Sequence, residues 1–290
     1  MEQKYIFIIN PNANRGRNRE VKVRIDRVCK KRNLDYEIRF TYRRGSATKI
    51  VKEYQDKEYI IYAVGGDGLI SEVVNGIVGT KNKLGVIPTG SGNDFARTML
   101  EIIPTTQKID LGKINNRYFL NIACLGMDTD SANNVFRMKK VGVPKNWLYT
   151  TSVVYTFFHY KAPVIELAIN GKRIKDELTM LAICNGRYYG GGYKVAPNAT
   201  VNDGLLDVYF VGKFNRIKIP KYLIKMRKGK HGETGKFKIF KTSQVEVKSN
   251  TKIRFTVDGE MLSGKEFKLT VLDKALTLYR NQDLEGKIIG

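Results

Sequence analysis

The sequence predicts an α/β N-terminal domain with a doubly wound sheet, followed by a second domain that is mainly an antiparallel β-sandwich. Apolar strand-like runs alternate with helical patterns as far as residue 124, which is typical of a mostly parallel sheet. Two glycine-rich turns each follow such a run directly. After residue 124, short β-like runs separated by Asn-Gly, Asp-Gly and Ser-Gly turns replace this alternation, which favours antiparallel pairing.

This change of pattern divides the chain into residues 1–124 and 125–280, with about residues 280–290 returning to the first domain. The strands expected in the first domain are 5–9, 34–40, 59–64 and 84–87. Those expected in the second domain are 164–169, 178–184, 205–211, 244–248, 253–257 and 267–272.

Four loops follow the four expected parallel strands and should therefore meet at one edge of the sheet. In open α/β sheets, ligands bind at this carboxyl edge. Two of the loops are rich in glycine, which lets backbone N–H groups approach a phosphate. Together the loops predict a nucleotide site. They comprise residues 10–16, 41–47, 65–69 and 89–94.

The turn that contains Asp67 lies between an apolar strand and an amphipathic helix. Its carboxylate would repel a phosphate, so Asp67 is expected to bind magnesium or to act as a polar catalytic group. The alternative is a tight turn with a solvated aspartate. The sequence has no GxxxxGK[ST] P-loop, and Phe95 stands where a dinucleotide fingerprint would have its third glycine.

Charge is the unusual property of this 290-residue chain, which has 51 Lys+Arg, 28 Asp+Glu and a formal net charge of +23. Such a balance favours anionic partners, although solubility explains part of the excess. Three widely spaced cysteines and two histidines do not suggest a disulfide framework, a histidine metal site or a catalytic triad. The absence of a signal peptide pattern and of a long apolar run predicts a cytoplasmic location.

Two stretches of the second half have more than one interpretation. Residues 146–160 are aromatic and uncharged over a helical length, which favours core packing or, alternatively, the wall of an acyl-chain cleft. Residues 215–231 form a basic amphipathic pattern that suits an anionic lipid surface or a packed helix with a solvated face. Nucleic-acid binding is not expected, because it would rest on charge alone.

Several motifs, in order along nearly the whole chain, resemble those of the diacylglycerol kinase catalytic family, which is related to sphingosine kinases and more distantly to NAD kinases. The Gly65-Gly66-Asp67-Gly68 turn alone would also fit NAD kinases, whereas the later Asn-Asp-Gly-Leu and Asp-Gly-Glu motifs point to the lipid-kinase branch. The motifs that carry the resemblance are residues 65–68, 72–76, 89–97, 108–112, 185–192, 196–207 and 257–260.

The resemblance implies an ATP-dependent lipid kinase that needs Mg²⁺, with a nucleotide-binding first domain and a lipid-binding second domain. Glu260 matches the family's proton acceptor, and Asp258 and Asp67 belong to the same catalytic cluster. Asp67, Asp94 and Asp110 match acidic positions linked to the phosphates through magnesium and water. Asp203, with the carbonyls of Thr200 and Leu205, matches a structural magnesium site. The positions that match the ATP site are Asn10, Pro11, Asn12, Ala13, Asn14, Thr41, Gly66, Asp67, Gly68, Leu69, Ile70, Ser71, Glu72 and Ser91.

The expected reaction is transfer of the γ-phosphoryl group to the hydroxyl of diacylglycerol or a similar neutral lipid, at an anionic membrane surface that the protein binds peripherally. One alternative is a different acceptor, either a sphingoid base or NAD. Another is a non-catalytic, nucleotide-binding regulator at membranes, because Leu69 stands where the family commonly has threonine. The sequence leaves a homodimer open.

Overall fold

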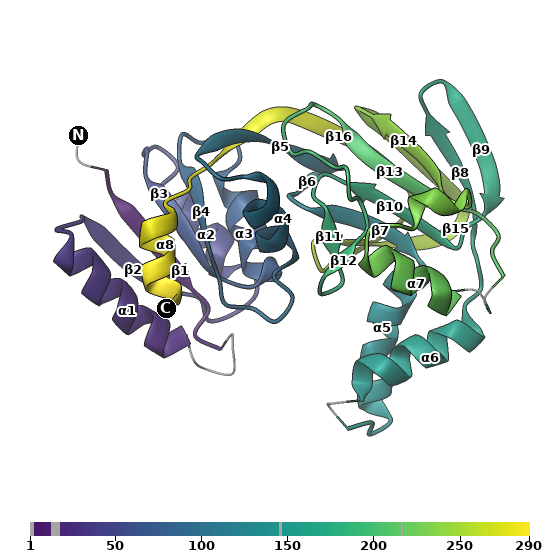
Figure 1. Cartoon of the computed structure of the whole chain (residues 1–290), viewed down its shortest axis with the longest axis horizontal. Helices are drawn as coiled ribbons and strands as arrows, with labels where there is room; N and C mark the ends of the chain where they lie inside the picture. The colour runs from purple at the N-terminus through teal and green to yellow at the C-terminus, as the bar shows by residue number, and fades with distance from the viewer. Residues whose placement is uncertain (1–2, 13–17, 145–146, 216, 218) are drawn as a thin grey trace.

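The structure is a computed structural model that describes residues 3–12, 18–144, 147–215, 217 and 219–290. Its first part is a parallel α/β domain with the strand order β2-β1-β3-β4, which confirms the predicted fold class (Figure 1). The elements of this domain are β1 (Tyr5–Ile9), α1 (Asn18–Lys31), β2 (Tyr36–Phe40), α2 (Ser46–Lys52), β3 (Ile60–Gly65), α3 (Asp67–Ile77), β4 (Lys83–Pro88) and α4 (Asp94–Ile102).

Helices cover both faces of this parallel sheet. All residues of β1 and β3 are buried, because alternate side chains enter different cores. Ile6 and Ile8 pack with α2, α3 and α4, whereas Phe7 and Ile9 pack with α1. The C-terminal helix α8 (Gln282–Ile289) joins the second of these cores, so the end of the chain lies against the first domain (Figure 1).

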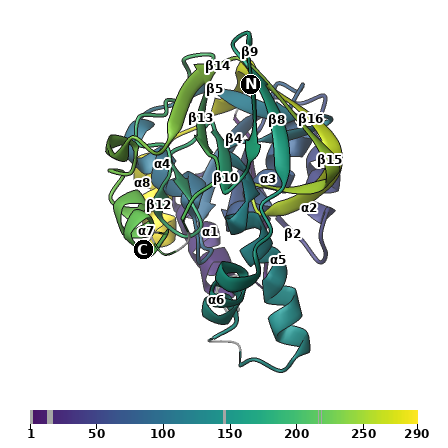
Figure 2. The ribbon, with the colours of Figure 1, turned by 90° about the vertical axis from the view of Figure 1, so that its right-hand side faces the viewer.

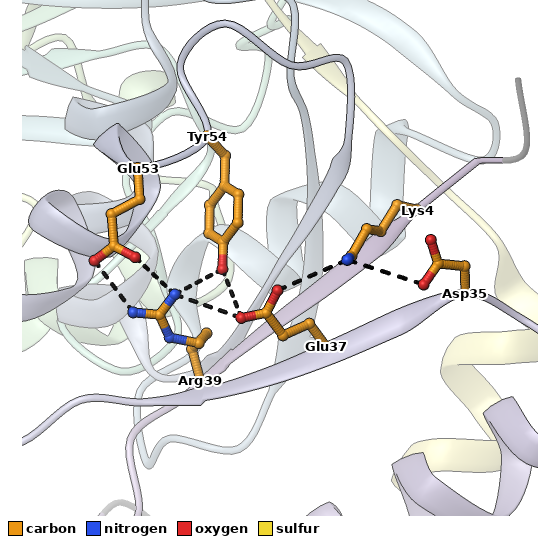
Figure 3. Close-up of polar contacts among 6 residues, drawn as sticks. All are labelled: Lys4, Asp35, Glu37, Arg39, Glu53 and Tyr54. Atoms are coloured by element: carbon orange, nitrogen blue, oxygen red, sulfur yellow. Dashed lines mark hydrogen bonds and ion pairs between the residues drawn. The ribbon is translucent and has the colours of Figure 1, made fainter.

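Charged side chains occupy the edge of this domain beside β2 (Figure 3). Arg39 of β2 contacts Glu53 at 2.7 Å, and the Tyr54 hydroxyl donates to Glu37 at 2.8 Å. Lys4 lies 3.9 Å from the same Glu37 carboxylate. Charged groups along an edge strand discourage pairing with another chain, a role that this network suits.

The second part is mainly antiparallel, as predicted. Its strands run β14-β13-β10-β7-β15-β16, and β16 then reaches the parallel strands through β4. The expected strands 244–248 and 253–257 are one long strand, β15, with an irregularity between Lys248 and Ile253. The strands are β5 (Gln107–Ile114), β6 (Arg117–Phe119), β7 (Ile122–Gly126), β8 (Val164–Ile169), β9 (Lys172–Glu177), β10 (Met180–Cys184), β11 (Tyr188–Tyr189), β12 (Tyr193–Lys194), β13 (Leu206–Val211), β14 (Lys238–Thr242), β15 (Gln244–Val257) and β16 (Glu260–Leu278).

Helices α5 (Met127–Lys140) and α6 (Leu148–His159) form a hairpin that projects from this second domain in both views (Figures 1 and 2). Helix α7 (Ile219–Arg227) lies on the same side of the domain. The interpretation of residues 146–160 as core packing is wrong for Trp147, Val154 and Phe158, which are exposed. None of the described helices has the length and apolar character needed to span a bilayer.

Candidate active site

A cleft of about 380 Å³ lies where the loops of the first domain meet the start of β16. Three of the four predicted loops contribute to its walls, and the turn before β16 closes it from the second domain. The cleft is lined by Asn10, Asn12, Thr41, Tyr42, Arg43, Arg44, Gly68, Leu69, Glu72, Gly259 and Glu260.

The two glycine-rich turns touch each other directly. A Cβ atom on Gly90 would lie 2.5 Å from the Cα atom of Gly66, a distance that no side chain could occupy. The Thr89 N–H donates to the Gly65 carbonyl at 2.9 Å, which joins the turns further. Glycine is therefore required at position 90, because the two backbones approach closely. The 89–94 loop contacts the 65–69 turn and does not itself line the cleft.

Asp67 and Asp94 begin helices α3 and α4 side by side. The Asp67 carboxylate accepts the Phe95 N–H at 3.2 Å, which links the two helix starts. Asp94 accepts the N–H groups of Gly191 and Gly192 at 2.9 and 2.8 Å. Burial raises the pKa of Asp94, the two N–H groups oppose this shift, and the nearby Asp67 charge adds to it.

Among the described contacts, backbone N–H groups at and just before the start of β7 hold Asp258. Its buried carboxylate accepts the N–H groups of Leu120 at 2.6 Å, Asn121 at 3.1 Å and Ile122 at 3.0 Å. Burial raises the pKa of Asp258 to about 6, although these three N–H groups favour its ionised form. The arrangement fixes the turn that delivers Glu260 to the cleft.

Glu260 is the first residue of β16, and its side chain is only 9% exposed. Its Oε1 atom lies 3.0 Å from Nη2 and 3.1 Å from Nε of Arg44. Its Oε2 atom contacts the guanidinium of Arg117, from β6. A carboxylate in this position faces the nucleotide loops and is oriented by two cations from other segments.

Glu72 lines the cleft, but its carboxylate is engaged by the loop before α2. It accepts the Gly45 N–H at 2.8 Å and the Ala47 N–H at 3.1 Å. Gly45 has φ +79°, a left-handed conformation that suits glycine. Glu72 therefore fixes the loop that carries Arg44, a role that the resemblance did not imply.

The other predicted ATP-site residues differ in how they meet the cleft. Asn10, Asn12, Thr41, Gly68 and Leu69 line it. The remaining described residues do not line it, and Ala13 and Asn14 lie outside the described residues. Those that do not line the cleft are Pro11, Gly66, Asp67, Ile70, Ser71 and Ser91, of which Ile70 and Ser71 are buried.

The predicted metal ligands lie in two regions of the structure. Asp94 lies beside Asp67 at the helix starts, whereas Asp110 lies beside the 200–205 loop. Within the described part of the chain, no three Asp, Glu, His or Cys side chains gather as a metal site. Asp110 accepts the N–H groups of Gly204 and Lys274, each at 2.7 Å. The Asp67 carboxylate, at the start of α3, has oxygen atoms of the kind that Mg²⁺ takes as ligands together with phosphates and water.

The loop of residues 200–205 fits a metal ion less well. The Asp203 carboxylate accepts the Leu205 N–H at 3.2 Å and lies 2.8 Å from the Lys241 ammonium, which lowers the pKa of Asp203 against the effect of burial. Lys241 also lies 3.6 Å from Asp207. Its ammonium already neutralises the carboxylate that a magnesium ion would use.

Two family profiles together cover nearly the whole chain. The diacylglycerol kinase catalytic domain matches residues 4–120, and the YegS C-terminal NAD kinase beta sandwich-like domain matches residues 121–280. The chain belongs to the diacylglycerol kinase family. Lipid kinases of this family use ATP. The cleft is therefore a candidate site for phosphoryl transfer.

Curated and solved members of the diacylglycerol kinase family resemble this chain over most of its length. A diacylglycerol kinase from Bacillus subtilis is 30% identical over 76% of this chain and 78% of its own. A YegS-like protein from Pseudomonas putida, described as a probable lipid kinase, is 31% identical over 84% of each chain. A crystal structure described as a diacylglycerol kinase from Bacillus anthracis strain Sterne has a TM-score of 0.76 at 22% identity and covers 98% of each chain, which shows the shared fold.

The structure adds two residues to those implied by the resemblance. The sequence placed the 41–47 loop at the nucleotide edge but gave Arg44 no role. Arg117, on β6, carried no sequence signal. Their contact with Glu260 joins positions that are 216 and 143 residues away in the chain, a pairing that only the fold brings about.

Proposed function

We propose that this family member transfers the γ-phosphoryl group of ATP to the hydroxyl of diacylglycerol or a similar neutral lipid. The observation that carries the proposal is that Glu260 shares one cleft with Asn10, Asn12, Thr41 and Gly68 from the nucleotide loops. Phosphoryl transfer depends on positioning and charge neutralisation, which loops and helix N-termini supply.

In this proposal Glu260 accepts the proton of the lipid hydroxyl as the hydroxyl oxygen attacks phosphorus. A carboxylate within hydrogen-bond reach suits this task, because the alcohol is a poor nucleophile until its proton leaves. Asp67 would hold Mg²⁺, which supplies charge neutralisation at the phosphates when bound. Asp258 acts on the reaction through the backbone by fixing the turn before Glu260.

The first prediction concerns Glu260→Gln, which keeps the shape of the side chain but removes its basicity. We expect lipid phosphorylation to fall by a factor of about 10² to 10⁴, the usual contribution of a general base. ATP affinity should change little. The assay uses Mg-ATP with lipids in mixed micelles and identifies products by mass spectrometry.

Glu266→Gln is the matched control, because Glu266 lies on the same strand with its side chain 69% exposed and pairs only with the surface Lys248 among its described ion pairs. It should keep wild-type turnover. Full activity of Glu260→Gln would show that another group takes the proton.

A panel of acceptors separates the alternatives. Diacylglycerols, a sphingoid base and NAD are supplied in parallel with labelled ATP. Phosphorylation of NAD or the sphingoid base alone would assign the same chemistry to a different acceptor. Tight ATP binding without turnover on any acceptor would favour a nucleotide-binding regulator.

We also propose that the protein acts while bound peripherally to an anionic membrane. The hairpin formed by α5 and α6 supports this, because α6 exposes Val154 and Phe158 while it buries Ser152 and Thr156. The exposed basic residues Arg137, Lys139, Lys140 and Lys161 lie on or beside the hairpin. Apolar side chains among basic ones match the acyl boundary and head groups of such a bilayer.

A further inference from the structure

Two arginines share the one carboxylate that we propose as the general base. Arg44 comes from the loop before α2 in the first domain, and Arg117 comes from β6. Each contacts a different oxygen of Glu260. The Arg44 side chain is 71% exposed and lines the cleft, whereas that of Arg117 is 31% exposed.

Other carboxylates near this pair are engaged by backbone N–H groups. Glu72 accepts from Gly45 and Ala47, and Asp258 accepts from the start of β7. Burial and the neighbouring Arg44 charge lower the pKa of Arg117, whereas Asp258 and Glu72 act in the opposite direction. The two guanidinium groups are thus close enough to repel each other, and Glu260 is their common direct partner among the described contacts.

Arg44 retains hydrogen-bonding capacity for a second anion. A guanidinium has five N–H donors, and the contacts with Glu260 involve only its Nε and Nη2 atoms. Its place on the cleft wall, beside Thr41, puts this capacity where the phosphates of a nucleotide would enter. A phosphate carries more negative charge than a carboxylate, and it can accept two parallel hydrogen bonds from one planar guanidinium group.

We propose that Arg44 moves from Glu260 to the terminal phosphate when ATP binds, while Arg117 stays on Glu260 and positions it. This inference rests on the proposed kinase function and adds two residues to it. Glu260 would then lose one cationic partner at the moment when the acceptor must be deprotonated. A carboxylate with one cation beside it takes up a proton more readily than one with two. Nucleotide binding would thereby prepare the base.

Binding measurements on the whole protein test the contact without relying on turnover. Isothermal titration with ATP and with ADP is compared for wild type, Arg44→Gln, Arg44→Lys and Arg117→Gln. We expect Arg44→Gln to weaken ATP binding about tenfold and ADP binding less than about twofold, since ADP lacks the terminal phosphate. Arg44→Lys keeps the positive charge but not the planar guanidinium group, so its loss of ATP affinity should lie between that of wild type and that of Arg44→Gln. Arg117→Gln should leave both affinities near wild type.

Lys52→Gln provides the charge-matched control, because Lys52 is exposed at the end of α2 and does not line the cleft. Equal losses for ATP and ADP in Arg44→Gln, or no loss of either, would overturn the proposal. Wild-type protein that binds neither nucleotide would instead count against the kinase function, so the two failures are distinguishable.

The pH dependence of kcat separates the two arginines. The value of kcat reports the substrate complex. If Arg44 has left Glu260 in that complex, Arg44→Gln leaves the acidic limb of the profile in place. Arg117→Gln removes the remaining cation and should move this limb to higher pH. A shift of similar size in both variants would show that Arg44 stays on Glu260 throughout.

Discussion

Leu69 follows the Gly65–Gly68 turn, at a position where the sequence resemblance led us to expect threonine, and its side chain has a structural role. It is 7% exposed and folds back over Gly65, where a Cβ atom would lie 2.6 Å from the Leu69 Cδ2 atom. It belongs to the core shared by α2, α3 and α4, and it also lines the cleft. Replacing it therefore affects both stability and the site.

We predict that Leu69→Thr raises kcat, because it restores a hydroxyl beside the nucleotide, and lowers the free energy of unfolding by about 1–3 kcal/mol. Denaturant titration and the micelle assay measure the two effects. Leu69→Val removes volume without adding a hydroxyl, so it should lose stability without gaining rate. A slower Leu69→Thr enzyme would mean that the apolar contact, not the hydroxyl, serves this site.

His231 gives a residue-scale prediction about pH. It is buried beside the rings of Tyr209 and Phe237, and burial lowers the pKa of its imidazole. The unfolded chain therefore takes up this proton first as the pH falls below about 6.5. We expect wild type to lose about 1 kcal/mol relative to His231→Phe between pH 7.5 and 5.5, measured by denaturant titration. Parallel curves for the two proteins would contradict this.

At the scale of elements, the sequence predicted β1, β3 and β4 well, because each is a short apolar run that is mostly buried, whereas β2 is half-buried and contains Glu37 and Arg39. The run at 5–9 has the observed bounds, and that at 84–87 differs by one residue at each end. The faces of α6 could not be predicted in this way. Ser152 donates to the Ser131 carbonyl and Asn134 donates to the Thr156 hydroxyl, so small polar side chains take part in the contact between α5 and α6 while Val154 and Phe158 are exposed.

The exposed apolar side chains of α6 give a prediction about membrane binding. The double substitution Val154→Ser and Phe158→Ser should weaken binding to anionic phospholipid vesicles about tenfold or more, because it removes apolar area from the docking face. The free energy of unfolding should hardly change, since both side chains are exposed. Vesicle sedimentation and denaturant titration measure these quantities.

Val23→Ser with Leu100→Ser is the matched control, because both residues are exposed on helices of the first domain, 53% and 67% respectively. This control should bind vesicles like wild type. Equal weakening by both pairs would assign vesicle binding to general surface hydrophobicity and not to the hairpin.

At the scale of the whole molecule, β16 joins the two domains into one cleft. The strand runs from Glu260 at the cleft to Leu278, which pairs with Leu84 of β4, so Glu260 and the parallel sheet of the first domain are connected by continuous backbone. The alternation of strands and helices in the sequence predicted that the loops of the first domain would meet at one edge of the sheet. The partners of Glu260 were not predictable, because long-range ion pairs depend on how the domains pack and leave no local pattern.

The net charge of +23 belongs to the same scale, because it acts over the entire surface. We predict that turnover of lipid in anionic vesicles falls several-fold as NaCl rises from about 0.05 to 0.5 M, where the Debye length shortens to a few ångströms. Turnover of a short-chain diacylglycerol dissolved as monomers should change much less, since it needs no surface. If both substrates respond equally, salt acts on nucleotide binding in the cleft, and attraction to the membrane does not limit the rate.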